Sequence, residues 1–309
     1  MMRRTLLHAA DSDRMREWIT RTPGSAAIVA RYVAGEQLTD VIRAARAVVA
    51  DGGTISCDRL GEHARSVDDA ERTRAAYEEL IAALTGAGLA TGADLSVKLS
   101  SLGQALGSDG PALATGHVLA IARAAQDAGA TVTLDMEDYP AVAPTLATLR
   151  AVREQVPTVG VAVQAALRRT EADCRELADA GARVRLCKGA YEEPVGVGHL
   201  GRHEVDRSYV RCLRTLMAGS GYPMIATHDP RLIEIAGALA IRYQRAPGAY
   251  EYQMLYGVRP AEQVRLARAG QRVRVYLPYG AEWYPYLVRR LAERPANLTF
   301  FLRSLVTRT

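Results

Sequence analysis

Short apolar runs alternate along this chain with longer segments whose apolar residues recur every three or four positions, and this alternation limits the fold more than any other feature. A helical pattern at residues 11–50 ends at Asp51-Gly52-Gly53. Longer segments with the spacing of amphipathic helices then separate the short runs, and we expect a last helix at 282–293. The short runs, which we interpret as strands, are 54–60, 94–99, 131–136, 159–163, 183–187, 223–227, 250–255 and 272–277.

Strand followed by helix, repeated in this way, predicts a parallel sheet built from βα units. Eight units make a (β/α)8 barrel of the TIM type, which takes about 250 residues, and residues 54–309 supply 256. The alternative is a doubly wound open sheet, which usually has about five to seven strands. We therefore expect an α/β protein in two parts, a helical arm at residues 1–53 packed on the barrel and the catalytic barrel at 54–309.

The composition excludes several classes of protein. Basic residues number 39 and acidic residues 34, and the two signs are interspersed, which argues against a nucleic-acid binder. Salt-sensitive binding to DNA or RNA would be the test of that class. The four cysteines lie far apart, so neither a disulfide framework nor a zinc ribbon is indicated.

The sequence predicts a cytoplasmic protein. It contains no apolar run of about 20 residues, the length that spans a membrane, and its first residues lack the apolar stretch of a signal peptide. The net charge of +5 permits contact with phosphates or with an anionic membrane surface without requiring either.

Polar residues stand at the carboxyl end of each expected strand, where the active site of a (β/α)8 barrel lies. Only two of the basic residues are lysines, Lys98 and Lys188, and both belong to apolar strands. A buried charge costs several kcal/mol unless it has a partner, and a bound anion would be such a partner. We interpret the set as a ring of site residues, although any one of them could simply pair between strand and helix. The other polar strand residues are Asp58, Ser100, Asp135, Glu137, Gln164, Arg185, Thr227, His228, Glu251, Gln253 and Tyr276.

The last expected helix carries Tyr286, Arg289, Arg290 and Glu293 within two turns. Glu293 lies three and four residues from the two arginines and can orient either guanidinium. A pair of arginines suits a carboxylate through bidentate hydrogen bonds, provided that the end of the helix lies over the ligand. Otherwise the two arginines form a solvated basic face.

Two other motifs are set aside. The G-x-G-x-x-G match at 196–201 follows Glu193-Pro194 rather than a strand, so we expect a loop and not a dinucleotide site. His199 and His203, with Glu204 beside them, could bind a metal only on a helix, and the glycines argue against a helix there. We therefore expect no metal.

Seven strings, taken together and in order, resemble the proline dehydrogenase family. They are SVKLSS from Ser96, LDMED from Leu134, VQAA from Val163, RLCKGAYEEP from Arg185, ATHD from Ala226, YEYQMLYGV from Tyr250, and RVYLPYG to RRLAERPAN over 274–297. The resemblance covers the whole expected barrel.

The resemblance implies a distorted (β/α)8 barrel that binds FAD non-covalently. The implied reaction is oxidation of L-proline to Δ1-pyrroline-5-carboxylate, by hydride transfer from proline C5 to flavin N5, with the electrons passed to a membrane quinone. A chain of 309 residues has no room for a fused aldehyde dehydrogenase. We therefore expect the single-activity form, whose product goes to a separate pyrroline-5-carboxylate dehydrogenase.

The resemblance also implies roles on the substrate side. Lys98, Arg289 and Arg290 resemble the clamp on the proline carboxylate, and Glu62 resembles the partner of Arg289 in an ion pair that closes the site. Asp135 resembles the acidic residue beneath Lys98 and near the flavin. The residues that resemble the packing around the pyrrolidine ring are Ala190, Tyr191, Leu255, Tyr276 and Tyr286.

The implied cofactor contacts divide into two groups. Residues resembling those at the isoalloxazine, the ribityl chain and the pyrophosphate are Gln164, Arg185, Lys188, Gly189 and Ala190, with Arg185 able to bond the flavin N5 region. Residues resembling those towards the adenosine half are Thr227, His228 and Glu251. No residue is assigned as a general base, and Asp229, where the family often has Asn, is assigned no role.

Two other enzyme hypotheses stay open. A Schiff-base aldolase would use Lys188 or Lys98 as its nucleophile, and it predicts borohydride trapping of a carbonyl substrate and a colourless protein. Oxidation of hydroxyproline would need room for a hydroxyl group, and Tyr276 is expected to fill that space, which favours proline.

Overall fold

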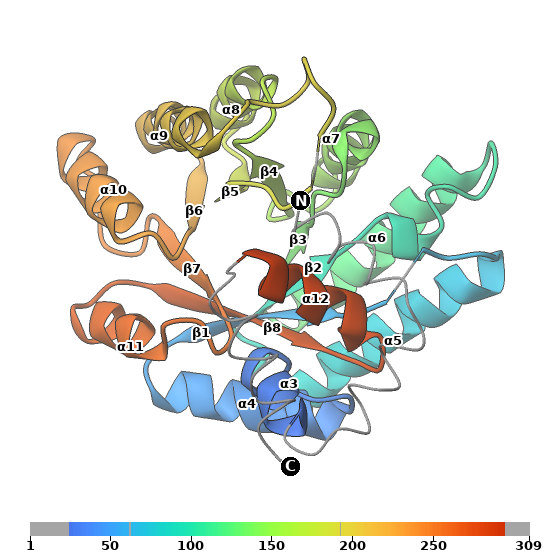
Figure 1. The fold of residues 1–309 in the computed structure, drawn as a ribbon. Coiled ribbons are helices and arrows are strands. Elements are labelled where there is room, and N and C mark those ends of the chain that lie inside the picture. Colours follow the sequence, from blue (N-terminus) through green and yellow to red (C-terminus); the bar gives the residue numbers. More distant parts are fainter. Residues whose placement is uncertain (1–24, 62, 192, 294–309) are drawn as a thin grey trace, which may run out of the picture.

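In the computed structural model, which describes residues 25–61, 63–191 and 193–293, parallel strands form one closed barrel (Figure 1). Each strand pairs with the next one along the chain, and β8 pairs with β1. The predicted (β/α)8 barrel is therefore confirmed, and the open sheet is excluded. The strands are β1 Thr54–Arg59, β2 Asp94–Val97, β3 Thr131–Leu134, β4 Gly160–Gln164, β5 Arg183–Cys187, β6 Tyr222–Ala226, β7 Glu251–Leu255 and β8 Val273–Tyr279.

Helices follow the strands on the outside of the barrel (Figure 1). The helices that follow β1 to β7 in turn are α5 Val67–Gly86, α6 Gly110–Asp127, α7 Tyr139–Arg153, α8 Thr170–Asp179, α9 Arg202–Ala218, α10 Pro230–Arg242 and α11 Pro260–Arg268. A short 3-10 helix, Ser100–Leu102, comes directly after β2. Before β1 lie α3 Ser25–Tyr32 and α4 Leu38–Ala50, and after β8 lies α12 Trp283–Glu293.

The two faces of the barrel wall differ in chemistry because successive side chains of a strand point to opposite sides. Along β1, Ile55 and Cys57 join the hydrophobic core between sheet and helices. Ser56 and Asp58 are buried as well, but they point into the barrel, where Arg185 of β5 reaches across to donate to Ser56. The interior of a TIM barrel is usually filled by Val, Ile and Leu. Here a hydrogen-bonded polar network takes that place.

The helix that completes the outer ring comes before the barrel in sequence. Helix α4 packs against β1, β8 and α5, and its Val41, Ala44 and Ala45 are buried in the core. It therefore takes the place beside the β1–β8 pair that the helix after β8 would fill in a regular repeat (Figure 1). This is a distortion of the barrel, and α4 is part of the ring. Residues 1–24 of the predicted arm lie outside the described residues.

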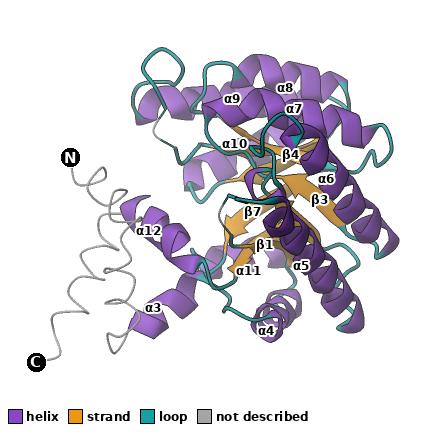
Figure 2. Ribbon diagram, turned by 90° about the vertical axis from the view of Figure 1, so that its right-hand side faces the viewer, coloured by secondary structure: helices purple, strands orange, loops and turns teal. Residues whose placement is uncertain are grey.

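Helix α12 lies with α3 at the carboxyl ends of the strands (Figure 2). Tyr32 and Leu60 pack with Trp283, Tyr286 and Leu287 in a second hydrophobic cluster, separate from the main core. Two backbone hydrogen bonds, from Ala34 N to Pro278 O at 2.8 Å and from Gly280 N to Gly35 O at 2.9 Å, join the segment after α3 to the end of β8.

A glycine allows α3 to lie close to the loop after β7. A Cβ at Gly257, whose φ is +69°, would lie 1.6 Å from the carbonyl oxygen of Arg31. Only glycine combines this left-handed conformation with so close an approach.

Candidate active site at the carboxyl ends of the strands

Lys98 and Asp58 form a buried ion pair at the mouth of the barrel, the end at which the strands terminate. Lys98 Nζ lies 2.6 Å from Oδ1 and 2.7 Å from Oδ2 of Asp58. Burial acts to lower the pKa of Lys98, but the carboxylates of Asp58 and Asp135 outweigh burial and hold this pKa above its ordinary value. Lys98 is therefore an ammonium at neutral pH.

Asp135 lies beside this pair with different hydrogen-bond partners. One of its oxygens accepts from Arg185, and the other accepts from the hydroxyl of Tyr276 at 2.7 Å. Asp135, which the resemblance assigns to the position beneath Lys98, is near enough for the two charges to act on each other, and the carboxylate hydrogen-bonded to Lys98 Nζ is that of Asp58. Burial raises the pKa of Asp135 against the opposing charges of Arg185 and Lys98, and burial and the charge of Asp135 raise the pKa of Tyr276 well above its ordinary value.

The guanidinium of Arg185 occupies the middle of the interior network, 5.4 Å from the centre of the Tyr276 ring. An arginine has five N–H donors, and each has an acceptor here. The acceptors are Gln253 Oε1 at 2.6 Å, Ser96 Oγ at 2.8 Å, Asp94 Oδ2 at 3.0 Å, Ser56 Oγ at 3.1 Å, and Asp135. A bond from Arg185 to a flavin would therefore require it to release one of these acceptors.

Glu137, Gln164 and Gly189 connect the ends of β3, β4 and β5. Glu137 accepts from Ser100 N at 3.1 Å and from Ser100 Oγ at 2.6 Å, and its own carbonyl accepts from Gln164 Nε2 at 2.7 Å. A Cβ at Gly189, whose φ is +110°, would lie 3.1 Å from Gln164 Oε1 and 3.0 Å from Ala166 Cβ. The backbone at Gly189 therefore passes directly over the Gln164 side chain. The next residue, Ala190, is half-buried.

Tyr191 lies in the segment after β5, at the mouth, where the charge of Arg289 from α12 acts on it. Its pKa is raised by burial and next by the charge of Glu137, while the charges of Arg289 and Lys98 act in the opposite direction. Glu137, Arg289 and Lys98 are therefore each near enough for their charge to act on Tyr191. Arg289 of the last helix and Lys98 thus both act on the same side chain, that of Tyr191.

Arg290 and Tyr286 lie differently from Arg289. The Arg290 guanidinium is 5.3 Å from the centre of the Tyr286 ring, a cation–π distance. Tyr286 itself is buried in the cluster that joins α12 to α3. Tyr286 therefore packs within the cluster between α12 and α3, and the Arg290 guanidinium lies beside its ring. Glu62, the predicted partner of Arg289, lies outside the described residues.

A second charged cluster lies at the ends of β5 and β6. Lys188 Nζ is 2.6 Å from Asp206 Oδ1 and 3.2 Å from Asp229 Oδ2. Arg231 binds both carboxylates, at 3.3 Å and 2.8 Å, and Asp229 caps α10 by accepting from Arg231 N at 3.1 Å. Hydrogen bonds from Arg231 and then the charge of Lys188 hold the pKa of Asp229 well below its usual range, although burial acts against them.

Thr227 and His228 lie between this cluster and β7. Thr227 Oγ1 accepts from Asp229 N at 3.1 Å. His228 Nε2 accepts from the backbone N–H of Leu255 at 2.9 Å, so this nitrogen carries no proton. The strand-end residues that the sequence singled out on β6 and β7 therefore meet, and Leu255 is next to Tyr276 in the sheet register.

A hollow of about 420 Å³ continues from Asp206 and Arg231 into the groove between α9 and α10. Val210, Leu232 and Ile235 provide its apolar wall, and its cationic residues include Arg207 and Arg231. A groove with cations and an apolar wall fits an elongated ligand that has both a charged and a planar apolar part.

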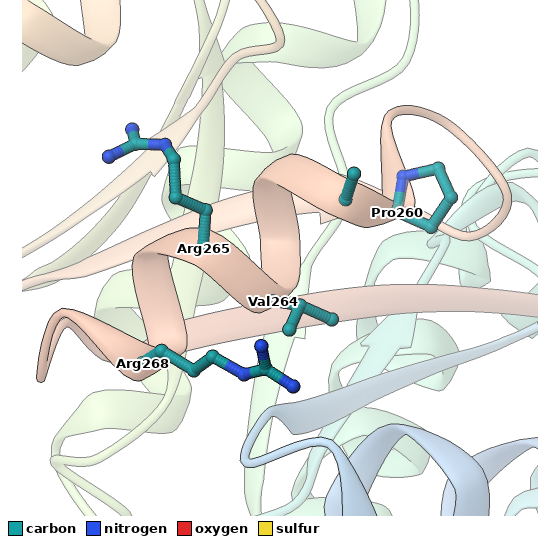
Figure 3. A pocket seen from close by; sticks show the side chains of 5 residues that line it. Pro260, Val264, Arg265 and Arg268 are labelled. Carbon is teal, nitrogen blue, oxygen red and sulfur yellow. The ribbon is translucent and has the colours of Figure 1, made fainter.

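Another hollow, of about 490 Å³, lies on the exposed face of α11 (Figure 3). Its lining residues come from that one helix, and Arg265 is paired there with Glu262 at 2.7 Å. None of the residues singled out from the sequence lines it. We assign it no role.

Glu251 lies below the mouth, where Gln253 links it to Arg185. It is the first residue of β7, so it belongs to the end of the barrel opposite the mouth. Its carboxylate is fully buried and forms a two-point ion pair with Arg274, at 2.6 and 2.9 Å. It also accepts from Gln253 Nε2 at 2.6 Å and from the hydroxyl of Tyr222 at 3.1 Å. The structure therefore does not place Glu251 with the residues expected to contact FAD.

Asp58, Glu137 and Asp206 are charged residues of these clusters to which the sequence reasoning gave no role. Asp58 and Glu137 had been noted only as polar residues at strand ends. For Asp58 a usable signal existed, since it lies two residues after Ser56 and therefore on the same face of β1. Asp206 is on α9, and no strand pattern marks it.

The sequence profile of the family described as "Proline dehydrogenase" matches residues 41–303. Proline dehydrogenase 1 of Bacillus subtilis strain 168 is 34% identical over 276 residues, which are 89% of this chain and 90% of that protein. Proline dehydrogenase of Deinococcus radiodurans is 36% identical over 278 residues, 89% of each chain.

Two solved structures of proline utilization A (PutA) have a similar fold. The protein from Bdellovibrio bacteriovorus, inactivated by N-propargylglycine, matches 86% of this chain and 32% of its own with a TM-score of 0.79 and 24% identity. A PutA variant from Bradyrhizobium japonicum matches 91% of this chain and 32% of its own with a TM-score of 0.73 and 25% identity. The present chain thus spans about one third of the length of these PutA chains.

Proposed function

Since the chain belongs to the proline dehydrogenase family, oxidoreductases of proline catabolism that act on a CH–NH bond, we propose that it oxidises L-proline to Δ1-pyrroline-5-carboxylate with non-covalently bound FAD. The observation that carries this proposal is that Lys98, directly after β2 and held by Asp58, and Arg289 of α12 both act by their charges on Tyr191 at the mouth. Two cations near a partly exposed aromatic ring suit a small ligand that has one carboxylate and one apolar ring.

The residues at the mouth would bind and orient proline. Lys98 and Arg289, with Arg290 next to it on α12, would hold the carboxylate. Tyr276, Leu255 and the Ala190-Tyr191 segment would pack against the pyrrolidine ring. Holding the ring at both ends fixes which carbon faces the acceptor, and such positioning is the protein's main contribution in a cofactor enzyme.

The residues at the ends of β4 to β6 fit FAD by their chemistry. Lys188, Arg207 and Arg231 offer cations for a pyrophosphate, and Thr227 and His228 stand beside them. The apolar wall of the groove between α9 and α10 suits an adenine ring. Gln164 and Gly189 connect this region to the mouth, where the isoalloxazine would face proline.

When bound, FAD would supply the hydride acceptor, the flavin N5. The chain's own part is electrostatic. Arg185 and Asp135 are bound to each other, and the hydroxyl of Tyr276 is held on Asp135. These contacts keep Tyr276 in one orientation beside the substrate, while α12 lies over the mouth and limits the entry of water.

The test is an absorbance spectrum of the purified protein, reconstituted with FAD, from 300 to 550 nm, before and after anaerobic addition of L-proline. A flavin spectrum that bleaches with L-proline, and not with D-proline, is the expected result. A flavin spectrum that L-hydroxyproline bleaches faster than L-proline would change the substrate. A colourless protein that cannot be reconstituted would overturn the proposal.

The aldolase hypothesis is not favoured by the geometry of the two lysines. A Schiff-base nucleophile must be a neutral amine. Lys98 is paired with Asp58, and Lys188 is paired with Asp206 and Asp229. The carboxylates near Lys98 favour its ammonium form, and Lys188 Nζ is engaged by two carboxylates.

We further propose that this is a cytoplasmic protein whose electrons pass to a membrane quinone, and whose product is consumed by a separate pyrroline-5-carboxylate dehydrogenase. Among the described residues no helix has the length and apolar character needed to cross a bilayer. The loop 193–201, the yellow segment that projects past α7 and α8 in Figure 1, exposes Val195 to 85% and Leu200 to 65%. This loop is the surface we propose for peripheral contact with the inner face of the cell membrane.

Sedimentation with anionic liposomes tests that contact. Replacing Val195 and Leu200 by Ser should reduce the bound fraction while leaving proline oxidation with a water-soluble dye unchanged. Ile241→Ser is the matched control, because Ile241 is 82% exposed at the end of α10 remote from the mouth. Equal binding by all three proteins, or no binding by the wild type at low salt, would refute the role of this loop.

A further inference from the structure

Asp58 is the most deeply buried group in contact with the proposed substrate clamp. Its side chain is 1% exposed, whereas that of Lys98 is 19% exposed and so reaches towards the open mouth. Both Asp58 oxygens accept from Lys98 Nζ, at 2.6 and 2.7 Å. Lys98 is thus bound from the interior of the barrel and accessible from outside.

The other carboxylates near Lys98 are engaged elsewhere. Asp135, directly after β3, accepts from Arg185 and Tyr276, and Glu137 in the same segment accepts from Ser100. Within the ranges that the structure describes, Asp58 is the one carboxylate in hydrogen-bond contact with Lys98 Nζ. The task of fixing the ammonium therefore falls to Asp58.

The backbone of Asp58 is itself rigidly held. Its register partners in the sheet are Ser96 of β2 and Pro278 of β8. Lysine has a flexible four-carbon stem and a strongly hydrated ammonium, so it needs an external support to present its charge in one direction. A buried carboxylate on a strand that is paired on both sides provides such a support.

The geometry leaves room for a second anion on Lys98. An ammonium has three N–H donors, and two of them are directed at the Asp58 oxygens. One donor remains for a ligand, and the exposed side of Lys98 is the side from which a ligand would come. Asp58 therefore both neutralises the buried side of the ammonium and directs the remaining donor outwards.

We propose that Asp58 is a positioning residue for proline oxidation, which acts by fixing Lys98 so that its free donor meets the substrate carboxylate. This inference rests on the proposed function, in which Lys98 binds that carboxylate. Asp58 itself touches neither substrate nor cofactor.

The proposal is tested with the FAD-loaded enzyme, L-proline and a water-soluble dye as acceptor. Asp58→Asn keeps the shape of the side chain and removes its charge. We expect KM for proline to rise about 10- to 100-fold, the range typical for loss of a residue that orients a ligand group, with kcat within about threefold of wild type. Such a split is the signature of lost binding that ground state and transition state share.

A pH profile gives a readout that a purely structural role would not move. Three carboxylates favour the charged form of Lys98, Asp58 from β1 and Asp135 and Glu137 from the segment after β3, while Arg289 of α12 is the cation that acts on the same tyrosine, Tyr191. Without Asp58, burial acts on Lys98 with less opposition, so the alkaline limb of kcat/KM should move to lower pH in Asp58→Asn. Asp68→Asn removes an exposed charge at the start of α5 and should leave both KM and the alkaline limb unchanged.

The decisive comparison uses Lys98→Met. If Asp58 acts through Lys98, adding Asp58→Asn to Lys98→Met changes KM by less than about twofold. An additive effect in the double variant, or a loss of kcat with KM and the pH profile unchanged, would overturn the proposal. Asp58→Glu, which keeps the charge, should recover part of the affinity and serves as the working variant if Asp58→Asn does not fold.

A failure of the proposed function itself would be seen in the wild-type protein, separately from the variants. A wild-type protein that does not oxidise proline contradicts the proposed function before any variant is made. A wild type that oxidises proline, together with a Lys98→Met variant of unchanged KM, refutes the role of Lys98 and with it that of Asp58.

Discussion

Glu251→Gln is the substitution whose effect the structure defines best. The Glu251 carboxylate is fully buried, and it pairs with an Arg274 guanidinium that is also buried. Removing one partner of a buried ion pair leaves an uncompensated charge and costs about 3–5 kcal/mol. Folded domains are stable by about 5–15 kcal/mol, so this change removes a large part of the total.

The assay is urea unfolding at 25 °C, followed by circular dichroism. Glu262→Gln is the matched control, because Glu262 makes the same two-point contact with Arg265, at 2.8 and 2.7 Å, on an exposed part of α11. A surface pair of this kind contributes about 0–1 kcal/mol. A loss below about 1 kcal/mol for Glu251→Gln would refute the reasoning from burial.

The dependence on pH has a defined sign. Burial acts to raise the pKa of Glu251, but the charge and hydrogen bonds of Arg274 outweigh it and hold this pKa below its ordinary value. A carboxyl group with a depressed pKa stabilises the folded state above the pKa of the unfolded chain, and this contribution is lost as the pH falls through the folded-state pKa. The difference between wild type and Glu251→Gln should therefore shrink in acid.

The same variant separates a structural role from a cofactor role. Because Glu251 lies at the end of the barrel opposite the mouth, the amount of FAD bound per folded molecule of the variant should match that of the wild type. A variant of normal stability that loses FAD would restore the original assignment of Glu251 to the adenosine half.

Three further predictions concern the mouth and its neighbourhood. Gly189→Ala should lower the free energy of unfolding by about 1–3 kcal/mol, measured by thermal denaturation. The loss should exceed that of Gly196→Ala, because a Cβ at Gly196, whose φ is +94°, would meet open space. Equal losses would contradict the close packing of Gly189 on Gln164. Asp229→Asn should reduce the loss of stability that the wild type shows as the pH falls below about 5, because the pKa of Asp229 is depressed by Arg231 and Lys188. Parallel pH curves of the two proteins from urea titrations would contradict this. Arg185→Lys replaces five donors by three, so at least two hydrogen bonds to buried acceptors are lost, and the free energy of unfolding in urea should fall by about 2–4 kcal/mol. A neutral effect would show that water replaces the missing donors.

Strand periodicity was enough to predict the barrel, because each strand is short, apolar on its outer face and followed by a helix. It could not predict which helix completes the ring. Helix α4 and helix α12 are both amphipathic, and the choice of which one packs beside β1 and β8 depends on contacts between distant parts of the chain. The position of α12 over the mouth was therefore stated only as a condition for the arginine clamp.

The partner of Lys98 shows a second limit of sequence reasoning. Alternation along a strand tells which side chains face the interior, and Asp58 and Asp135 both satisfy that rule. Which of them reaches Lys98 depends on how far neighbouring strands are staggered, and the barrel's stagger is a property of the closed sheet. Glu251 shows the opposite case, since its place at the beginning of a predicted strand already indicated the end remote from the mouth.

Helix α4, and not α12, completes the outer ring, and this has a consequence for how the chain folds. The sheet closes where β8 meets β1, and Thr54 there bonds to Val273, 219 residues away. Contacts so distant in sequence form late, because a long loop must be closed first. During synthesis the edge of β1 that pairs with β8 therefore stays unpaired until β8 has emerged. Three residues separate the end of α4 from the beginning of β1, so α4 can cover the outer face of that strand as soon as both have been synthesised.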